Sequence, residues 1–256
     1  RLDEAAALIA ETIPVARRIL GPNHTIMTVL CRAADIARLR GDLDEARSRL
    51  DEARWSCERG DIMAIDSWEG ATTCQAALVA RDEGAYDIAR GLLDDLCGRL
   101  VGPGPEQEAE LSPGIRIARA SIEVRRGNPD AAIEDLKFVL DQRPDLAHFD
   151  ALEAVDLVAV ALTQHGKVLQ AAALFGAVNR ERANCGVVLP APDTRIREKA
   201  MSQAQAALGD DWDTSVEQGY SLPHEQSVEL AASEIGASES PSVARQDRYR
   251  KGVTSS

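Results

Sequence analysis

The chain has 256 residues, of which 45% are hydrophobic and only 4% aromatic, and its formal net charge is −13. So acidic a balance argues against a free-standing nucleic-acid binder, which normally presents a basic face. No apolar run is long enough to span a bilayer and no signal peptide is recognisable. We therefore expect a cytoplasmic protein that binds neither nucleic acid nor membranes.

The first predicted helix covers residues 2–20. Residues 1–5 (RLDEA) match residues 41–46 (GDLDEA) with the glycine removed. The chain would therefore start inside a repeat, without the first helix of that hairpin, and we expect a fragment of a longer protein. A helix that lacks its partner exposes an apolar face, which favours self-association.

Four helical hairpins follow, and each is expected to turn at a glycine. The turns at Gly41, Gly84, Gly127 and Gly166 are separated by 43, 43 and 39 residues (84−41, 127−84 and 166−127). Glycine can end a helix with a positive φ because it has no Cβ. The predicted helix pairs are 26–40 with 43–58, 61–83 with 86–100, 115–126 with 129–141, and 148–165 with 168–184.

Four positions around each turn repeat the same residue types. Alanines stand seven residues before the glycine and five after it, which lets two antiparallel helices approach closely. Larger apolar side chains stand mostly at the ninth and twelfth positions, and the ninth lies on the same face as the second alanine. Recurrence at about 40 residues indicates a helical-hairpin solenoid. The four sets are Ala34, Ala46, Leu50 and Ala53; Ala77, Ala89, Leu93 and Leu96; Ala120, Ala132, Leu136 and Val139; and Ala159, Ala171, Phe175 and Val178.

The repeats are predicted to occupy residues 1–185, and the pattern changes after them. Residues 186–235 are predicted to form a helical cap, in which Trp212 closes the end of the array. The expected helices of this cap are 193–208, 211–219 and 223–235.

Residues 236–256 contain Ser, Glu, Arg and Gly with almost no large apolar side chain. That composition is typical of a disordered tail, because such a segment buries too little apolar surface to fold. Its basic residues, Arg245, Arg248, Arg250 and Lys251, are interpreted as solubilising charges, with contact to nucleic acid or an acidic partner as the alternative.

Residues 41–46 (GDLDEA) closely match the turn of a tetratricopeptide repeat, and the whole hairpin resembles that family. Pro144 falls where the family often ends its second helix, although the repeats here are longer than the usual length of about 34 residues. The resemblance implies an all-α superhelix whose first helices line a concave groove that binds a protein or peptide.

Carried over by register, the resemblance places a partner-binding groove on the first helix of each hairpin. The Lys/Asn arrangement with which some such repeats clamp a C-terminal carboxylate is absent, so that mode of capture is not expected. A peptide, another domain of the same polypeptide and a small molecule all stay open as occupants, and plain helix packing explains most positions equally well. The expected groove residues are Thr28, Cys31, Asp35, Arg38, Cys74, Leu78, Arg81, Asp82, Ser121, Arg125, Glu153 and Asp156.

A second series of positions runs through residues 150–235. It consists of residues 172–178 (AALFGAV), Arg182, residues 189–190 (LP), residues 207–209 (ALG), Trp212, Gly219, Leu222, Glu225, Val228 and residues 230–231 (LA). The series resembles the C-terminal part of the repeat region in actinobacterial LuxR-type and SARP-type transcriptional regulators that contain an ATPase. The resemblance implies a region that senses a signal or partner and restrains the ATPase. The family's nucleotide and DNA sites lie outside this region, so no functional residue is carried over.

The chain contains no phosphate-binding loop, no dinucleotide-binding motif and no zinc-protease motif. We therefore predict no enzymatic activity, no cofactor and no metal. Trp55 and Trp68 flank the turn at Gly60 and are expected in the core, because large apolar side chains usually bury; an interaction site is the alternative.

The cysteines and histidines show no metal-binding spacing. The cysteines lack a CxxC motif and are interpreted as reduced, buried thiols, and the histidines, far apart in the sequence, as solvated or capping residues. They are Cys31, Cys57, Cys74, Cys97 and Cys185, and His24, His148, His165 and His224.

These observations predict a non-catalytic sensor or protein-interaction module, the C-terminal regulatory part of a bacterial ATPase-containing transcriptional regulator. A stand-alone tetratricopeptide adaptor for protein assembly is the alternative. An effector domain encoded upstream of Arg1 would favour the regulatory part over the stand-alone adaptor.

Overall fold

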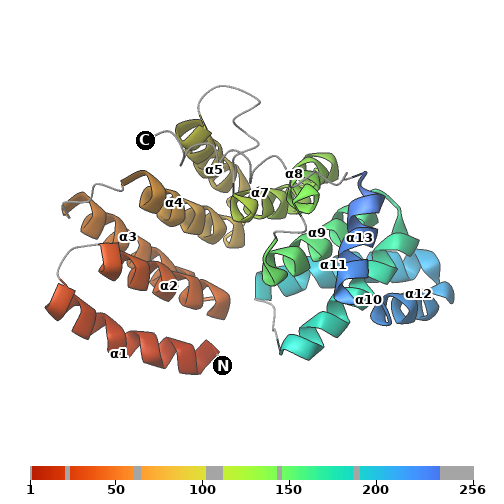
Figure 1. The fold of residues 1–256 in the computed structure, drawn as a ribbon, viewed down its shortest axis with the longest axis horizontal. Helices are drawn as coiled ribbons and strands as arrows, with labels where there is room; N and C mark the ends of the chain where they lie inside the picture. Colours follow the sequence, from red (N-terminus) through yellow and green to blue (C-terminus); the bar gives the residue numbers. More distant parts are fainter. Residues whose placement is uncertain are drawn as a thin grey trace, which may run out of the picture. The chain divides into compact units, whose positions relative to one another are not determined.

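The structure, a computed structural model, describes residues 2–20, 24–59, 65–101, 112–142, 146–186 and 191–236. Every regular element within these ranges is an α-helix (Figure 1), which confirms the all-α prediction. The helices are α1 (Leu2–Leu20), α2 (His24–Arg40), α3 (Leu43–Arg59), α4 (Ile65–Asp82), α5 (Tyr86–Val101), α7 (Pro113–Arg126), α8 (Pro129–Asp141), α9 (His148–Gln164), α10 (Val168–Cys185), α11 (Ala191–Leu208), α12 (Asp211–Tyr220) and α13 (His224–Glu234).

The predicted helix ends lie close to the observed ones. Helix α7 starts at Pro113 rather than at residue 115, because proline is well suited to the first helical turn, where its missing N–H costs nothing. The predicted restart of a helix at residues 60–61 and the predicted tail beyond residue 236 fall outside the described residues.

The four turn glycines have a left-handed backbone, with φ of +83° at Gly41, +82° at Gly84, +78° at Gly127 and +77° at Gly166. The Gly41 N–H donates to the carbonyl of Arg38 (2.9 Å), and the following N–H donates to the carbonyl of Ala37 (2.9 Å). This pair of bonds is the Schellman motif, which satisfies carbonyls left free at a helix end. Equivalent bonds close the turns at Gly84 and Gly166.

Replacing Gly84 by alanine is expected to lower the free energy of unfolding by about 1 kcal/mol, because a side chain strains a left-handed residue. A Cβ there would meet nothing within 4 Å, so the cost is purely conformational. Gly91, inside α5, is equally open but has helical backbone, and Gly91→Ala should instead stabilise by about 0.5–1 kcal/mol. Urea unfolding of both variants tests the prediction, and equal signs would contradict it.

The repeated positions form the core of the protein. All sixteen residues of the four predicted sets are buried, and the most exposed of them, Leu50, has only 3% of its surface accessible. Around Gly41, Ala34, Ala46 and Leu50 belong to one apolar cluster, and around Gly84, Ala77, Ala89 and Leu93 belong to another. The predicted packing role of these positions is therefore confirmed.

The chain divides into two compact units. Unit 1 consists of Arg1–Arg126 together with Val188–Glu198, and unit 2 consists of Gly127–Val187 together with Lys199–Ser256. In unit 1 each helix from α1 to α5 packs on the next, as Figure 1 shows, and α5 packs on α7. The first helices of the hairpins also contact one another, α2 with α4 and α4 with α7, so they form one layer.

Unit 2 is built around α9 and α10. Helix α13 contacts α8, α9 and α10, while α12 crosses α10 at very short range. Two glycines allow this crossing: an ideal Cβ on Gly219 would lie 1.7 Å from the carbonyl oxygen of Ala173, and one on Gly176 would lie 2.0 Å from that of Val216. Trp212 on α12 is buried, as expected.

Several exposed side chains differ from the sequence-based expectations. Trp55 is 47% exposed, so its assignment to the core was wrong; the side chain of Trp68 lies outside the described part of the chain. Among the cysteines, Cys185 is exposed rather than buried, and Cys31 and Cys74 are half-buried. Large size and apolar character favour burial only where a neighbouring helix covers that face of the element.

Helix α1 packs on α2 with one face and leaves the other open. Ile13 and Ala16 are buried against α2, whereas Leu8 and Ile19 are 68% and 69% exposed. Self-association through this open face stays a prediction.

Candidate functional site

Half of the predicted groove residues meet in one polar cluster of unit 1. They extend from three neighbouring first helices, α2, α4 and α7, and one further carboxylate joins them from α11. We call this set the arginine cluster. Its members are Asp35, Arg38, Arg81, Asp82, Ser121, Arg125 and Asp193.

The link between α2 and α4 runs through Asp82, whose side chain is fully buried. Arg38 donates to Asp35 on its own helix (2.8 Å) and to Asp82 on α4 (3.0 Å). Arg81 donates to the other oxygen of the Asp82 carboxylate at 2.7 Å. One carboxylate therefore lies between two guanidinium groups, which compensate the cost of burying its charge.

The link between α4 and α7 runs through Ser121. Arg81 donates to its hydroxyl (2.9 Å), and Arg125 donates to its backbone carbonyl (2.6 Å). The hydroxyl in turn donates to the carbonyl of Ala118 (2.7 Å), so it both accepts and donates a hydrogen bond within the layer.

Asp193, in the first turn of α11, contacts the guanidinium groups of Arg81 and Arg125. Its Oδ1 forms an ion pair with Arg125 and lies 3.3 Å from Nη2 of Arg81. The segment Val188–Glu198 thus belongs to unit 1 although the residues on both sides of it belong to unit 2.

Neighbouring charges and burial shift the pKa of three members of the arginine cluster, Asp193, Arg38 and Arg125. Burial raises the pKa of Asp193, but Arg81, Arg125 and Arg38 outweigh burial and hold it below its usual range. Burial likewise lowers the pKa of Arg38, but Asp35 and Asp82 outweigh it and the net shift is upward. Burial and the neighbouring Arg81 lower the pKa of Arg125, which remains protonated at neutral pH because guanidinium groups are very weak acids.

Three of the four remaining groove residues of unit 1 pack against apolar clusters. Cys31 packs against the apolar cluster between α1 and α2, and Cys74 and Leu78 pack against the cluster around α4 and α5. Burial raises the pKa of the Cys31 thiol to about 11, so it is a neutral thiol at pH 7. Thr28 on α2 is half-buried.

The last two predicted groove residues, Glu153 and Asp156, lie on α9 in unit 2. Glu153 is exposed, whereas Asp156 is buried and accepts a hydrogen bond from Arg182 on α10 (2.9 Å). Asp156 therefore ties two helices of one hairpin together.

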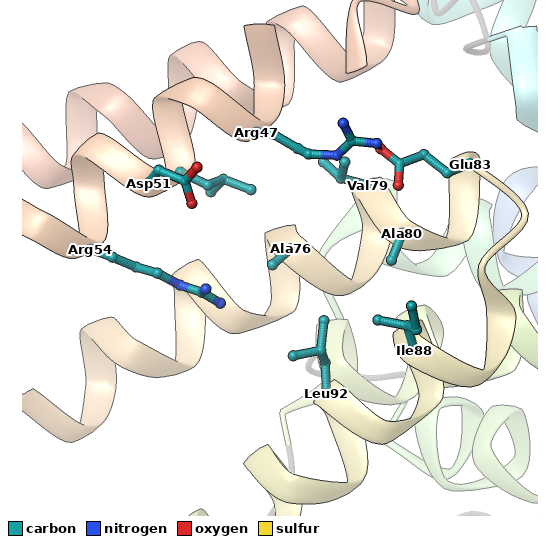
Figure 2. Close-up of a pocket in the computed structure, with 10 residues that line it drawn as sticks. Arg47, Asp51, Arg54, Ala76, Val79, Ala80, Glu83, Ile88 and Leu92 are labelled. Atoms are coloured by element: carbon teal, nitrogen blue, oxygen red, sulfur yellow. The ribbon is translucent and has the colours of Figure 1, made fainter. Parts of the chain in front are cut away.

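A cavity of about 230 Å³ opens elsewhere on unit 1, between α3, α4 and α5 (Figure 2). The side chains of Arg47 and Glu83 point toward each other at one end and form an ion pair, while Arg54 lies at the other end. The cavity could receive one apolar side chain with polar neighbours, since its remaining walls are largely apolar. They are Leu50, Asp51, Ala76, Val79, Ala80, Ile88 and Leu92.

Sequence reasoning found the arginines but missed their carboxylate partner, Asp193. An acidic residue in the first turn of a helix ordinarily indicates a favourable interaction with the helix dipole. Arg125 and Asp193 are 68 residues apart in the sequence. Nothing in residues 191–198 themselves indicates that this helical turn packs against helices so far away along the chain.

Comparison with protein-family models, with curated proteins and with solved structures finds no match for this chain. Among the described helices, none combines the length and apolar character that crossing a membrane requires. The class that the fold defines is accordingly an all-α protein of repeat-like helical hairpins.

Proposed function

We propose that this chain is a non-catalytic binding module whose α2–α4–α7 layer recognises an acidic protein segment. The observation that supports the proposal is Asp193, a carboxylate from outside the repeats that is held by Arg81 and Arg125. Guanidinium groups bind carboxylates with directed, charge-assisted hydrogen bonds, which suits them to recognise an acidic side chain.

In this proposal Asp193 is an internal occupant that a partner replaces. A tethered group competes at an effective concentration in the millimolar range, so a free partner binds well only when the internal contact is weakened. In this proposal the module binds its partner in the state in which Asp193, at the start of α11, no longer contacts Arg81 and Arg125.

The test uses a fluorescently labelled peptide of residues 188–198 and the full chain carrying Asp193→Asn. The vacated arginines should bind this peptide about 10-fold more tightly than the wild-type chain does, because the internal competitor has lost its charge. Asp213→Asn, an exposed aspartate on α12, is the matched control and should behave as wild type.

A second peptide carrying asparagine in place of its own aspartate should not bind the Asp193→Asn chain. If both peptides bind that chain equally, or if the variant binds no better than wild type, the arginine cluster is a structural ion-pair network and not a recognition site.

We further propose that the module is the C-terminal regulatory part of a bacterial ATPase-containing transcriptional regulator. This rests on the resemblance over residues 150–235, and Gly176 and Gly219, both in the matching series, are the residues that allow α12 to cross α10 closely. The reading frame upstream of Arg1 tests it. An ATPase-like region with a phosphate loop supports regulation in cis, and a stop within a few tens of codons favours the stand-alone adaptor.

A further inference from the structure

Three side chains of the kind that bind metals gather in unit 2, away from the arginine cluster. His148 is the first residue of α9, while Glu181 and Cys185 lie near the end of α10. Because Glu181 and Cys185 are four residues apart on a helix, they project from the same face. One ligand atom from each residue lies within 4.8 Å of the other two.

Two distances within this trio match the separation expected between ligands of one shared ion. Nε2 of His148 lies 3.7 Å from Oε2 of Glu181, which exceeds the range of about 2.7–3.2 Å for an N–H···O bond. Nε2 also lies 3.7 Å from Sγ of Cys185, a distance at which sulfur forms a weak hydrogen bond in the absence of an ion. Ligands about 2.0–2.3 Å from a tetrahedral zinc ion are separated from one another by about 3.3–3.8 Å.

His224, the first residue of α13, adds a further nitrogen donor beside the trio. Its ring centroid is 4.1 Å from that of His148. Its Nδ1 is buried and has no hydrogen-bond partner in the described part of the chain, which is unusual for a polar atom.

The backbone that carries His224 is held against α10. Arg180, next to Glu181 in the sequence, donates hydrogen bonds to the carbonyls of Ser221 (3.3 Å) and Leu222 (2.7 Å). The start of α13 is therefore fixed beside the trio by contacts that are independent of any ion.

We propose that His148, Glu181 and Cys185 bind a zinc ion, with His224 as the nearest further nitrogen donor. A thiolate and an imidazole select zinc over magnesium or calcium, which prefer all-oxygen sites. On binding, the Cys185 thiol gives its proton to solvent and its sulfur forms the bond to zinc. His148 has 41% of its side chain exposed, which gives the ion a path of entry.

The test uses the full chain without a histidine tag, reduced and freed of metal by a chelator. Cobalt(II) is titrated first, because it reports its ligands by absorption, and zinc then displaces it. We expect one cobalt ion per chain, a thiolate-to-cobalt charge-transfer band and the strong visible bands of tetrahedral cobalt. Zinc should also raise the melting temperature of the wild-type chain, since a ligand that binds only the folded state stabilises it.

Single substitutions in the trio identify the site. Cys185→Ser should abolish the charge-transfer band and weaken zinc binding at least about 100-fold, and His148→Gln should weaken zinc binding similarly. Loss of a residue that only hydrogen-bonds to a metal ligand already costs about 10–100-fold in affinity, so loss of a ligand should cost at least as much. His165→Gln is the matched control: His165 lies at the other end of α9, pairs with Asp130 at 3.1 Å, and should leave binding unchanged.

Because His148 and Cys185 are exposed, both variants should fold, and equal melting temperatures without metal would establish this. The proposal is overturned if the Cys185→Ser chain binds zinc as tightly as wild type. An octahedral cobalt spectrum without the thiolate band, or no binding of zinc below millimolar concentration, would overturn it equally.

Discussion

Gly219→Ala is expected to destabilise unit 2 by about 3 kcal/mol or more. The added Cβ would lie 1.7 Å from the carbonyl oxygen of Ala173, a backbone atom of α10 that cannot move without shifting the helix. Overpacking of a core usually costs about 1–3 kcal/mol, and here no flexible side chain can absorb the clash. The gain of helix propensity from glycine to alanine, about 1 kcal/mol, offsets only part of this cost.

Hydrogen exchange of the amides in α10 and α12, combined with urea unfolding, measures the effect where it arises. Gly176→Ala should act in the same way, because its Cβ would meet the carbonyl oxygen of Val216 at 2.0 Å. Gly91→Ala, a helical glycine in open surroundings, is the control and should be stabilising. Unchanged protection in α10 and α12 of the Gly219→Ala protein would show that these helices do not cross as described.

Asp82→Asn is expected to lower the free energy of unfolding by about 3–5 kcal/mol. Removing one member of a buried ion pair is strongly destabilising, and Asp82 is the fully buried carboxylate that lies between Arg38 and Arg81. The amide keeps the shape of the side chain, so the loss reports charge rather than packing.

The matched control is Asp94→Asn, which removes a carboxylate from an ion pair with Arg90 that is 51% exposed on the aspartate side. Exposed pairs of this spacing contribute about 0.3–0.5 kcal/mol. Urea unfolding at neutral pH compares the two, and similar losses would contradict the inferred role of Asp82. In Arg38→Met combined with Asp82→Asn the losses should be less than additive, since the two residues interact directly.

The hairpins could be predicted because their determinants are local. The glycines at residues 41, 84, 127 and 166 need a positive φ, and the alanines at fixed distances from them need a close helix neighbour; both requirements are visible in a single repeat. Periodicity then predicts which face is buried, and all sixteen repeated positions are buried.

Contacts that join distant segments could not be predicted in this way. Arg38 and Arg81 both stand three residues before a turn glycine, and that register placed them on one face. Asp193 reaches the same face only because a later segment returns to unit 1. The trio on α9 and α10 was missed for a similar reason, since 37 residues separate His148 from Cys185 and no short motif spans them.

The return of Asp193 to unit 1 has a consequence for synthesis on the ribosome. Arg125 is made 68 residues before its counter-charge. At about 5–20 residues per second, roughly 3–14 s pass between the two. During that interval the nascent hairpins already contain Arg125 but not the carboxylate that later pairs with it. Arg125 is therefore open to an acidic surface nearby until Asp193 has been made, and the newly made chain is most receptive to such a surface before its own sequence is complete.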